Sequence, residues 1–200
     1  GFIGKNLIYH LSKTNHKIFA YYKSRKPKFK LNRIEYIKFD IKKKNSKILK
    51  TIKPEIIFHL AWSKIPDFSL KNSLQNLNNS INFFNQVAKI GSCKKIIVSG
   101  SCFENYDIKK NKMKQIEHFV FAKNSLKKFL FNKDFNKKIK VGWFRIFFVY
   151  GKYQKSASLI PTLIQNFKKD IKPLIKNIFT KNDYIHVDDV CNVLVKSINT

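Results

Sequence analysis

Several residue types are scarce in this sequence, and each scarcity narrows the kind of protein that it encodes. The three cysteines, Cys93, Cys102 and Cys191, lie far apart, form no Cys-x-x-Cys pair or zinc pattern, and cannot all pair because their number is odd. We therefore expect no metal site, and a reducing, cytoplasmic location. No run of about 18 uncharged apolar residues occurs, so we expect no membrane-spanning helix, and no signal-peptide pattern is visible.

Acidic residues are also few, at 12 against 41 basic residues, which gives a formal net charge of +29. Such a charge favours binding to nucleic acid or to an anionic membrane surface, or it reflects a biased composition. Only Arg25, Arg33 and Arg145 are arginines, although arginine is the usual reader of phosphates and bases, and the lysines are spread along the whole chain. We therefore favour biased composition and expect no specific nucleic-acid partner, while the field still attracts small anionic ligands.

The residues that are abundant predict a globular α/β protein. Apolar residues make up 44% of the chain and aromatic residues 14%, whereas the 6 glycines and 5 prolines form no linker and no repeat is visible. Apolar periodicity predicts helices over residues 4–12, 46–52, 73–90, 117–130, 158–168 and 187–198, and strands over 17–22, 34–39, 55–60, 95–98 and 140–148. This alternation, with strands apolar on both faces, predicts a doubly wound parallel sheet with its functional residues just after the strands.

The first four residues, Gly1, Phe2, Ile3 and Gly4, run directly into the first predicted helix. They match the second half of a Gly-x-x-Gly-x-x-Gly turn, in which glycines admit a pyrophosphate to the N–H groups of a helix N-terminus. A helix-packing pair of glycines is the alternative. We favour the dinucleotide site, and we expect the first strand of the sheet to lie upstream of Gly1, outside this sequence.

The loop after the predicted strand 17–22 indicates which nicotinamide cofactor to expect. An NAD site usually has an acidic residue there to bind the ribose hydroxyls, but residues 23–26 contain none. Ser24 and Arg25 suit a 2′-phosphate instead, which favours NADP, with NAD as the other choice. The alternative is one more exposed basic loop in a lysine-rich chain.

Several short segments, in a shared order, resemble the extended short-chain dehydrogenase/reductase family, the NAD(P)-dependent epimerases and dehydratases that act on nucleotide sugars. They are Gly1–Gly4, Phe39–Ile41, Pro54–Ala61, Val98–Ser101, Tyr150–Gly151 and Asp183–Val190. The resemblance implies a Rossmann-type sheet with its first strand missing. It also implies a dinucleotide-binding domain over residues 1–150, part of a small substrate lobe over 151–200, and a homodimer formed through the helices 73–90 and 117–130.

The resemblance also implies roles for single residues. Ser101 matches the catalytic serine that polarises a substrate carbonyl, and Lys123 matches the lysine that binds the nicotinamide ribose and lowers the pKa of a neighbouring tyrosine. Further positions near the cofactor are Asp40 and Ile41 beside the adenine, and Leu60, Ala61 and Trp62 after the fourth strand of the family's sheet. We expect structural roles for His59, and for the polar positions Asn76, Ser80 and Asn82 in the long helix.

Three departures from the family pattern concern the chemistry. The family's Tyr-x-x-x-Lys pair places both side chains on one helix face, but residue 119, four before Lys123, is Phe. Tyr106 is the nearest alternative phenol. At residue 148 a Phe stands where the family often has a substrate-binding Asn, and Asn182 stands where it often has an Arg that holds the diphosphate.

The sequence therefore supports two functions, and we carry both. The first is an NAD(P)-dependent oxidoreductase, epimerase or dehydratase acting on a nucleotide sugar, with a 4-keto reductase as one form. The second, favoured by Phe119, is a cofactor-binding module that has lost catalysis. For Asp188 and Asp189 we expect capping of the last helix rather than chemistry.

Overall fold

The computed structural model describes residues 1–27, 31–105, 116–175, 179 and 181–200. Tyr106, the alternative phenol, lies outside the described residues. The chain divides into two compact units. Unit 1 comprises Gly1–Ile18, Leu31–Ile34 and Phe147–Thr200, and unit 2 comprises Phe19–Lys30 and Glu35–Ile146.

Unit 2 is built on a parallel sheet of three strands. These are β3 (Ile56–His59), β4 (Lys95–Ser101) and β5 (Lys140–Ile146), in the order β3-β4-β5. The β4 strand is central, pairing with β3 from Ile56↔Lys95 and with β5 from Lys95↔Lys140. Its residues Ile96, Ile97 and Val98 are fully buried, as expected for the β-branched central strand of a parallel sheet.

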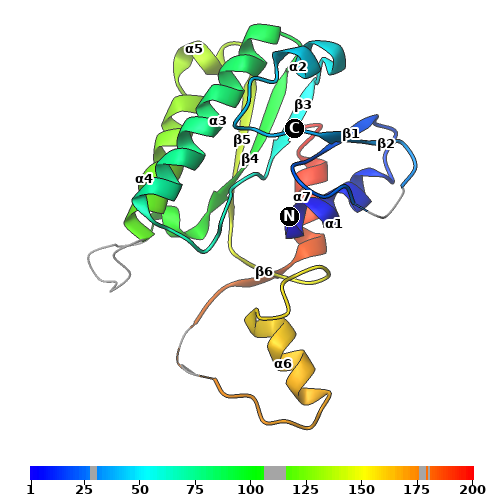
Figure 1. The fold of residues 1–200 in the computed structure, drawn as a ribbon, viewed down its shortest axis with the longest axis vertical. Coiled ribbons are helices and arrows are strands. Elements are labelled where there is room, and N and C mark those ends of the chain that lie inside the picture. Colours follow the sequence, from blue (N-terminus) through cyan, green and yellow to red (C-terminus); the bar gives the residue numbers. More distant parts are fainter. Residues whose placement is uncertain (28–30, 106–115, 176–178, 180) are drawn as a thin grey trace. The chain divides into compact units, whose positions relative to one another are not determined.

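Two long helices, α3 (Leu70–Ile90) and α4 (Ile116–Leu130), pack against each other and cover one face of this sheet (Figure 1). Helix α3 begins three residues before the predicted start because the Ser69 side chain caps it, accepting a hydrogen bond from the N–H of Asn72. It ends at Gly91, whose φ of 76° is the left-handed conformation that glycine adopts most easily. Shorter helices are α2 (Ser46–Ile52), the 3₁₀ turn η1 (Cys102–Asn105) and α5 (Lys133–Asn136).

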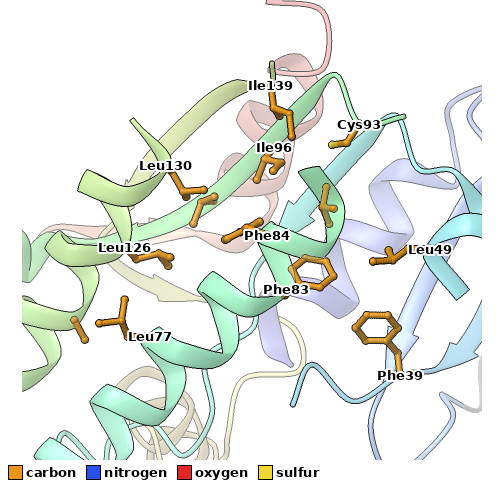
Figure 2. Close-up of a cluster of buried hydrophobic side chains, with 13 residues drawn as sticks. Phe39, Leu49, Leu77, Phe83, Phe84, Cys93, Ile96, Leu126, Leu130 and Ile139 are labelled. Atoms are coloured by element: carbon orange, nitrogen blue, oxygen red, sulfur yellow. The ribbon is translucent and has the colours of Figure 1, made fainter. Parts of the chain in front are cut away.

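The hydrophobic core of unit 2 lies between the β3-β4-β5 sheet and the helices on it (Figure 2). Phe84 from α3 and Leu126 from α4 have no exposed surface, and Leu49 from α2 joins them. Burying a side chain of this size contributes roughly 1.5–3 kcal/mol relative to leaving it in water. The core therefore fixes α4, and with it Lys123, against the sheet.

The strands β1 (Ile18–Tyr22) and β2 (Ile34–Lys38) form a separate two-stranded sheet. The α/β class with parallel strands is thus confirmed, but the described strands form three sheets, whereas the sequence predicts one doubly wound sheet without its first strand. The physical reason is that no described strand lies between β1 and β3 to bond to both. The ring of Phe39, just after β2, stacks on Tyr21 and meets Phe83 edge-on, which ties this strand pair to the core cluster.

Unit 1 contains helices α1 (Phe2–Leu11), α6 (Leu159–Phe167) and α7 (Val187–Lys196), and the parallel strand pair β6 (Phe148–Tyr150) and β7 (Tyr184–His186). Helices α1 and α7 pack together. The single strand predicted over 140–148 is wrong in its extent, since the chain leaves the sheet at Phe147 and begins β6. The domain boundary predicted at residue 150 stays a prediction.

Candidate active site

Ser101 is the last residue of β4 and is 8% exposed. Its hydroxyl oxygen accepts a hydrogen bond from the N–H of Phe103, 3.3 Å away, which turns the chain into η1. The carboxyl end of the central strand is the place where a parallel sheet carries its functional residues. The predicted position of Ser101 at a strand end is therefore what the structure shows, although β4 runs three residues further than predicted.

Glu104 in η1 is a buried carboxylate that sequence analysis missed. One carboxylate oxygen accepts the backbone N–H of Ser101 at 2.5 Å, and the other accepts the indole N–H of Trp143 at 2.9 Å. The signal available in the sequence was an acidic residue three positions after Ser101, in a chain with only 12 acidic residues. Both oxygens are thus satisfied by donors from β4 and β5.

Lys123 projects from α4 toward the end of the same strand and is 4% exposed. Its ammonium group donates to the backbone oxygen of Ser99 at 2.7 Å and lies 4.1 Å from the centre of the Trp62 ring. Burial lowers the pKa of Lys123 from 10.5 to about 7, and the charge of Glu104 opposes this by favouring the protonated form. The structure therefore brings an amine that titrates near neutral pH to the strand that carries Ser101.

Phe119 lies one helical turn before Lys123 and is buried in an apolar cluster. Its ring meets Trp62 edge-on with 5.5 Å between centroids, and the ring of Phe68 is 5.0 Å away. The Lys123 ammonium is 5.8 Å from the centre of the Phe119 ring. The helix thus presents Phe119 and Lys123 together as the Tyr-x-x-x-Lys spacing predicts, but the first of them carries no ionisable proton.

His59, at the end of β3, is buried and hydrogen-bonded. A ring nitrogen, Nε2, lies 3.2 Å from the hydroxyl of Ser80, and the ring packs against Phe83 and Phe84. Burial, with the charge of Lys123 as a smaller cause, lowers the pKa of His59 to about 3. A neutral, packed ring supports the structural role expected of His59.

Asn76 in α3 fixes the loop that follows β3. Its side-chain oxygen accepts the backbone N–H of Ser63 at 2.8 Å, and its amide donates to the backbone of Asn72 at 2.9 Å. The loop residues Leu60 and Trp62 are half-buried and Ala61 is exposed. The loop that was expected near the cofactor is therefore held from the helix side.

The expected adenine and phosphate contacts of unit 2 lie in exposed or half-buried loops. Ser24 and Arg25 are exposed after β1. One Asp40 oxygen accepts the N–H of Lys42 at 3.1 Å and the other lies 3.8 Å from the ammonium of Lys23, as in a turn-forming aspartate. Ile41 packs against the core cluster.

Helix α1 of unit 1 begins at Phe2, two residues before the predicted start, so Phe2, Ile3 and Gly4 form its first turn and Gly1 is its N-cap. No side chain caps α1 at Gly1, its first turn has no acidic residue, and a Cβ added at Gly1 or Gly4 would meet no atom within 4 Å. A helix start whose first turn lacks an acidic side chain suits a phosphate group, because its N–H groups and dipole favour an anion. Phe2 and Ile3 are half-buried within this first turn.

The start of α7 differs from the expectation that Asp188 and Asp189 cap it. The cap is His186, whose side chain accepts the N–H of Asp188, and both aspartates lie in the first turn, where their charge suits the helix dipole. Asp188 instead binds His10 of α1, with 2.9 Å between the carboxylate and the ring nitrogen. Hydrogen bonding to His10 is the main reason that the pKa of Asp188 is lowered.

The sequence profile of the NAD dependent epimerase/dehydratase family matches residues 1–200. The chain belongs to this family. No curated protein matches the sequence significantly. The family is NAD-dependent by its description, and the resemblance drawn from the sequence motifs is confirmed.

Solved structures that include a dehydratase and an epimerase share the fold of this member of the family. They include TunA, an NAD-dependent NDP-hexosamine 5,6-dehydratase involved in tunicamycin biosynthesis (20% identity, TM-score 0.74, covering 100% of this chain and 69% of that one). A second is UDP-glucuronic acid 4-epimerase from Bacillus cereus, in complex with UDP-glucuronic acid and NAD (20% identity, TM-score 0.73, covering 100% of this chain and 71% of that one). A third is the enzyme WbmG from Bordetella bronchiseptica, in complex with NAD and UDP (18% identity, TM-score 0.72, covering 98% of this chain and 64% of that one).

Among the residues that the structure describes, no helix is both long and apolar enough to span a membrane. Within the same residues, no group of three or more His, Cys, Asp or Glu side chains is arranged to hold a metal ion.

Proposed function

We propose that this protein is an NAD(P)-dependent enzyme that acts on a nucleotide sugar, and that reduction of a 4-keto sugar is its reaction. The observation that carries the proposal is the buried pair at the end of β4, where Lys123 is held by the Ser99 carbonyl beside Ser101. Family membership supports the cofactor class, and relatives that were solved with NAD and UDP or UDP-glucuronic acid support the substrate class.

The residues present fit a nicotinamide dinucleotide. The uncapped start of α1, from Gly1 through Phe2 and Ile3 to Gly4, offers N–H donors for the pyrophosphate. Lys123 uses one N–H on Ser99, so it retains donors for the nicotinamide ribose.

The remaining proposed cofactor contacts come from loops of unit 2. The loop after β3, with Leu60, Ala61 and Trp62, and the residues after β2, Asp40 and Ile41, would line the nicotinamide and adenine parts. At the loop after β1, the exposed pair Ser24 and Arg25 favours the 2′-phosphate of NADP over NAD, because no acidic residue stands there for a ribose diol.

The chemistry follows from what each side chain can donate. The cofactor supplies the hydride. The Ser101 hydroxyl would donate a hydrogen bond to the substrate carbonyl oxygen and polarise it. Lys123, with a pKa of about 7, would deliver the proton that the reduced oxygen needs, because Phe119 cannot.

A second function is favoured by the packing of Phe119 itself. Its ring fills an apolar cluster with Trp62 and Phe68, where the family has a phenol. A protein with this substitution could bind the cofactor and a nucleotide sugar without turning either over. In that case the same residues serve a binding module rather than an enzyme.

Calorimetric titration of the full protein with NAD, NADH, NADP and NADPH tests both functions at once, since both require association. Turnover on a panel of nucleotide sugars and their 4-keto forms then separates them. An active wild type supports the enzyme, whereas an inert wild type together with an active Phe119→Tyr variant supports the binding module. Phe131→Tyr, an exchange of the same kind at an exposed position directly after the same helix, is the matched control. Absence of binding to any dinucleotide would contradict both.

We also propose that the protein is a homodimer located in the cytoplasm. Apolar side chains of both long helices are exposed, among them Leu70 and Leu74 of α3 and Phe121 of α4. Exposed large apolar side chains on a pair of packed helices are a feature of many subunit interfaces. All three cysteines are free thiols, which supports a reducing compartment.

A further inference from the structure

Glu104 needs an explanation because it is a buried carboxylate, 8% exposed, that neither the sequence motifs nor the family assignment accounts for. Removing a carboxylate from water is costly unless hydrogen bonds or an opposite charge compensate it. Here the two oxygens accept the N–H of Ser101 and the indole N–H of Trp143. The carboxylate therefore joins the end of β4 to β5 through charge-assisted hydrogen bonds.

The strand itself leaves room for this carboxylate. Gly100 precedes Ser101, and a Cβ added there would collide with the Glu104 carboxylate and with the Trp143 indole. The backbone of Gly100 is not in the left-handed region, so space rather than conformational freedom explains why glycine stands there. A side-chain-free residue thus lets a carboxylate and an indole approach β4 directly beside Ser101.

The Glu104 carboxylate lies against Gly100, and the Lys123 ammonium binds the carbonyl of the preceding residue, Ser99, so the two groups flank neighbouring residues of β4. From there the charge of Glu104 favours the protonated amine against the effect of burial. The other titratable groups described around them are His59 on β3, which is neutral, and the Cys102 thiol, whose pKa is raised mainly by burial and to a lesser extent by Glu104. Glu104 is therefore the one negative charge among the described groups that interact with Lys123.

We propose that Glu104 is a positioning residue that fixes Ser101 at the end of β4 and supplies the counter-charge for Lys123. The inference deepens the proposed function and rests on it for its catalytic meaning. In this role Glu104 acts through Ser101 and Lys123 and does not itself contact the substrate. One carboxylate thereby sets both the position of the Ser101 hydroxyl and the charge of the Lys123 amine.

Three variants separate charge from packing. Glu104→Gln keeps the shape but has one acceptor oxygen for two donors and no charge. Trp143→Phe removes one donor and keeps the charge. Glu104→Asp keeps the charge on a shorter side chain.

The readout is the titration of Lys123 in full-length protein labelled with ¹³C-lysine, followed by NMR. The Lys123 resonance is identified by its absence from Lys123→Met. In Glu104→Gln we expect the Lys123 titration to move about one pH unit lower, so that the protonated fraction at pH ~7 falls about fivefold. In Trp143→Phe and Glu104→Asp it should stay near that of the wild type. The Ser101 amide proton, downfield in the wild type because of the carboxylate, should move upfield in Glu104→Gln.

A merely structural role predicts a different pattern. It would lower stability in Glu104→Gln and Trp143→Phe alike while leaving the Lys123 titration in place. Coincident titrations of wild type and Glu104→Gln, or an equal displacement in Trp143→Phe, would overturn the proposal. Because this readout needs no cofactor and no turnover, failure of the dinucleotide titration would remove the proposed function while the role of Glu104 is still decided.

Discussion

Replacing Lys123 by methionine should make the protein more stable at neutral pH, although it removes a hydrogen bond. The ammonium is buried against Trp62 and the Ser99 carbonyl, and its pKa falls from 10.5 in the unfolded chain to about 7 in the fold. One pH unit of pKa corresponds to about 1.4 kcal/mol. Protonated Lys123 therefore costs the folded state about 5 kcal/mol relative to the neutral amine.

The sign follows from proton binding. Between about pH 7 and about pH 10.5 the unfolded chain holds a proton on this lysine and the folded chain does not, so stability rises with pH across that window. Below about pH 7 both states are protonated and the cost is constant. Methionine carries no proton and avoids this cost. It leaves the buried Ser99 carbonyl without a hydrogen-bond donor, however, which costs the folded state about 1–3 kcal/mol. The net gain of Lys123→Met at pH ~7 is then about 2–4 kcal/mol, and the variant should be the less stable one at pH ~11.

Urea unfolding of wild type and Lys123→Met at steps from about pH 6 to about pH 11 measures this difference directly. The expected result is a stability difference that changes by about 1.4 kcal/mol per pH unit in the window and changes sign within it. Lys128→Met, which removes an exposed ammonium from the same helix, is the control and should follow the wild-type curve. A difference between wild type and Lys123→Met that does not vary with pH would refute the reasoning.

Three further predictions concern the core, the cofactor and the oligomer. Leu126→Ala, at a position with no exposed surface, should lower the free energy of unfolding by about 2–5 kcal/mol, whereas Leu174→Ala at an exposed position should leave the urea midpoint unchanged. Arg25→Ala should weaken NADPH binding about tenfold without weakening NADH binding, as measured by calorimetry. An equal loss of NADPH binding in Lys26→Ala would contradict a specific role of Arg25. Phe121→Glu should convert a dimer to a monomer in light scattering coupled to size exclusion, and a wild type that is already monomeric would contradict the proposed interface.

The elements with strong periodicity are those that the sequence predicted well. The long helices α3 and α4 and the central strand β4 each carry an apolar pattern that matches their burial, and Ser101 follows from the rule that functional residues stand at strand ends. The short strands β6 and β7 were misjudged or missed because three residues are too few to show a period. The described strands also form three sheets rather than the predicted single sheet without its first strand, since pairing depends on neighbours that local patterns do not reveal.

The contacts that define the site were the least predictable part. Lys123 is held by a backbone carbonyl, that of Ser99, and a backbone acceptor has no side-chain signature. Glu104 binds Ser101 and Trp143, which lie on two strands, so their proximity exists only once β4 and β5 are paired. The spacing of Phe119 and Lys123, by contrast, could be predicted because it depends only on the helical turn.

Phe119 and the lowered pKa of Lys123 belong to one physical arrangement. A tyrosine at position 119 could offer a hydroxyl to its surroundings, whereas the phenylalanine and Trp62 form an apolar wall beside the amine. An apolar wall adds to the desolvation that lowers the pKa of Lys123, so the residue change that removes the family's usual proton donor also favours an amine that exchanges protons near neutral pH. Loss of the phenol and gain of a titrating lysine are thus two consequences of the same packing. On this argument, Phe119→Tyr should raise the pKa of Lys123 as well as supply a phenol, and the two effects are separated by following the Lys123 titration in that variant.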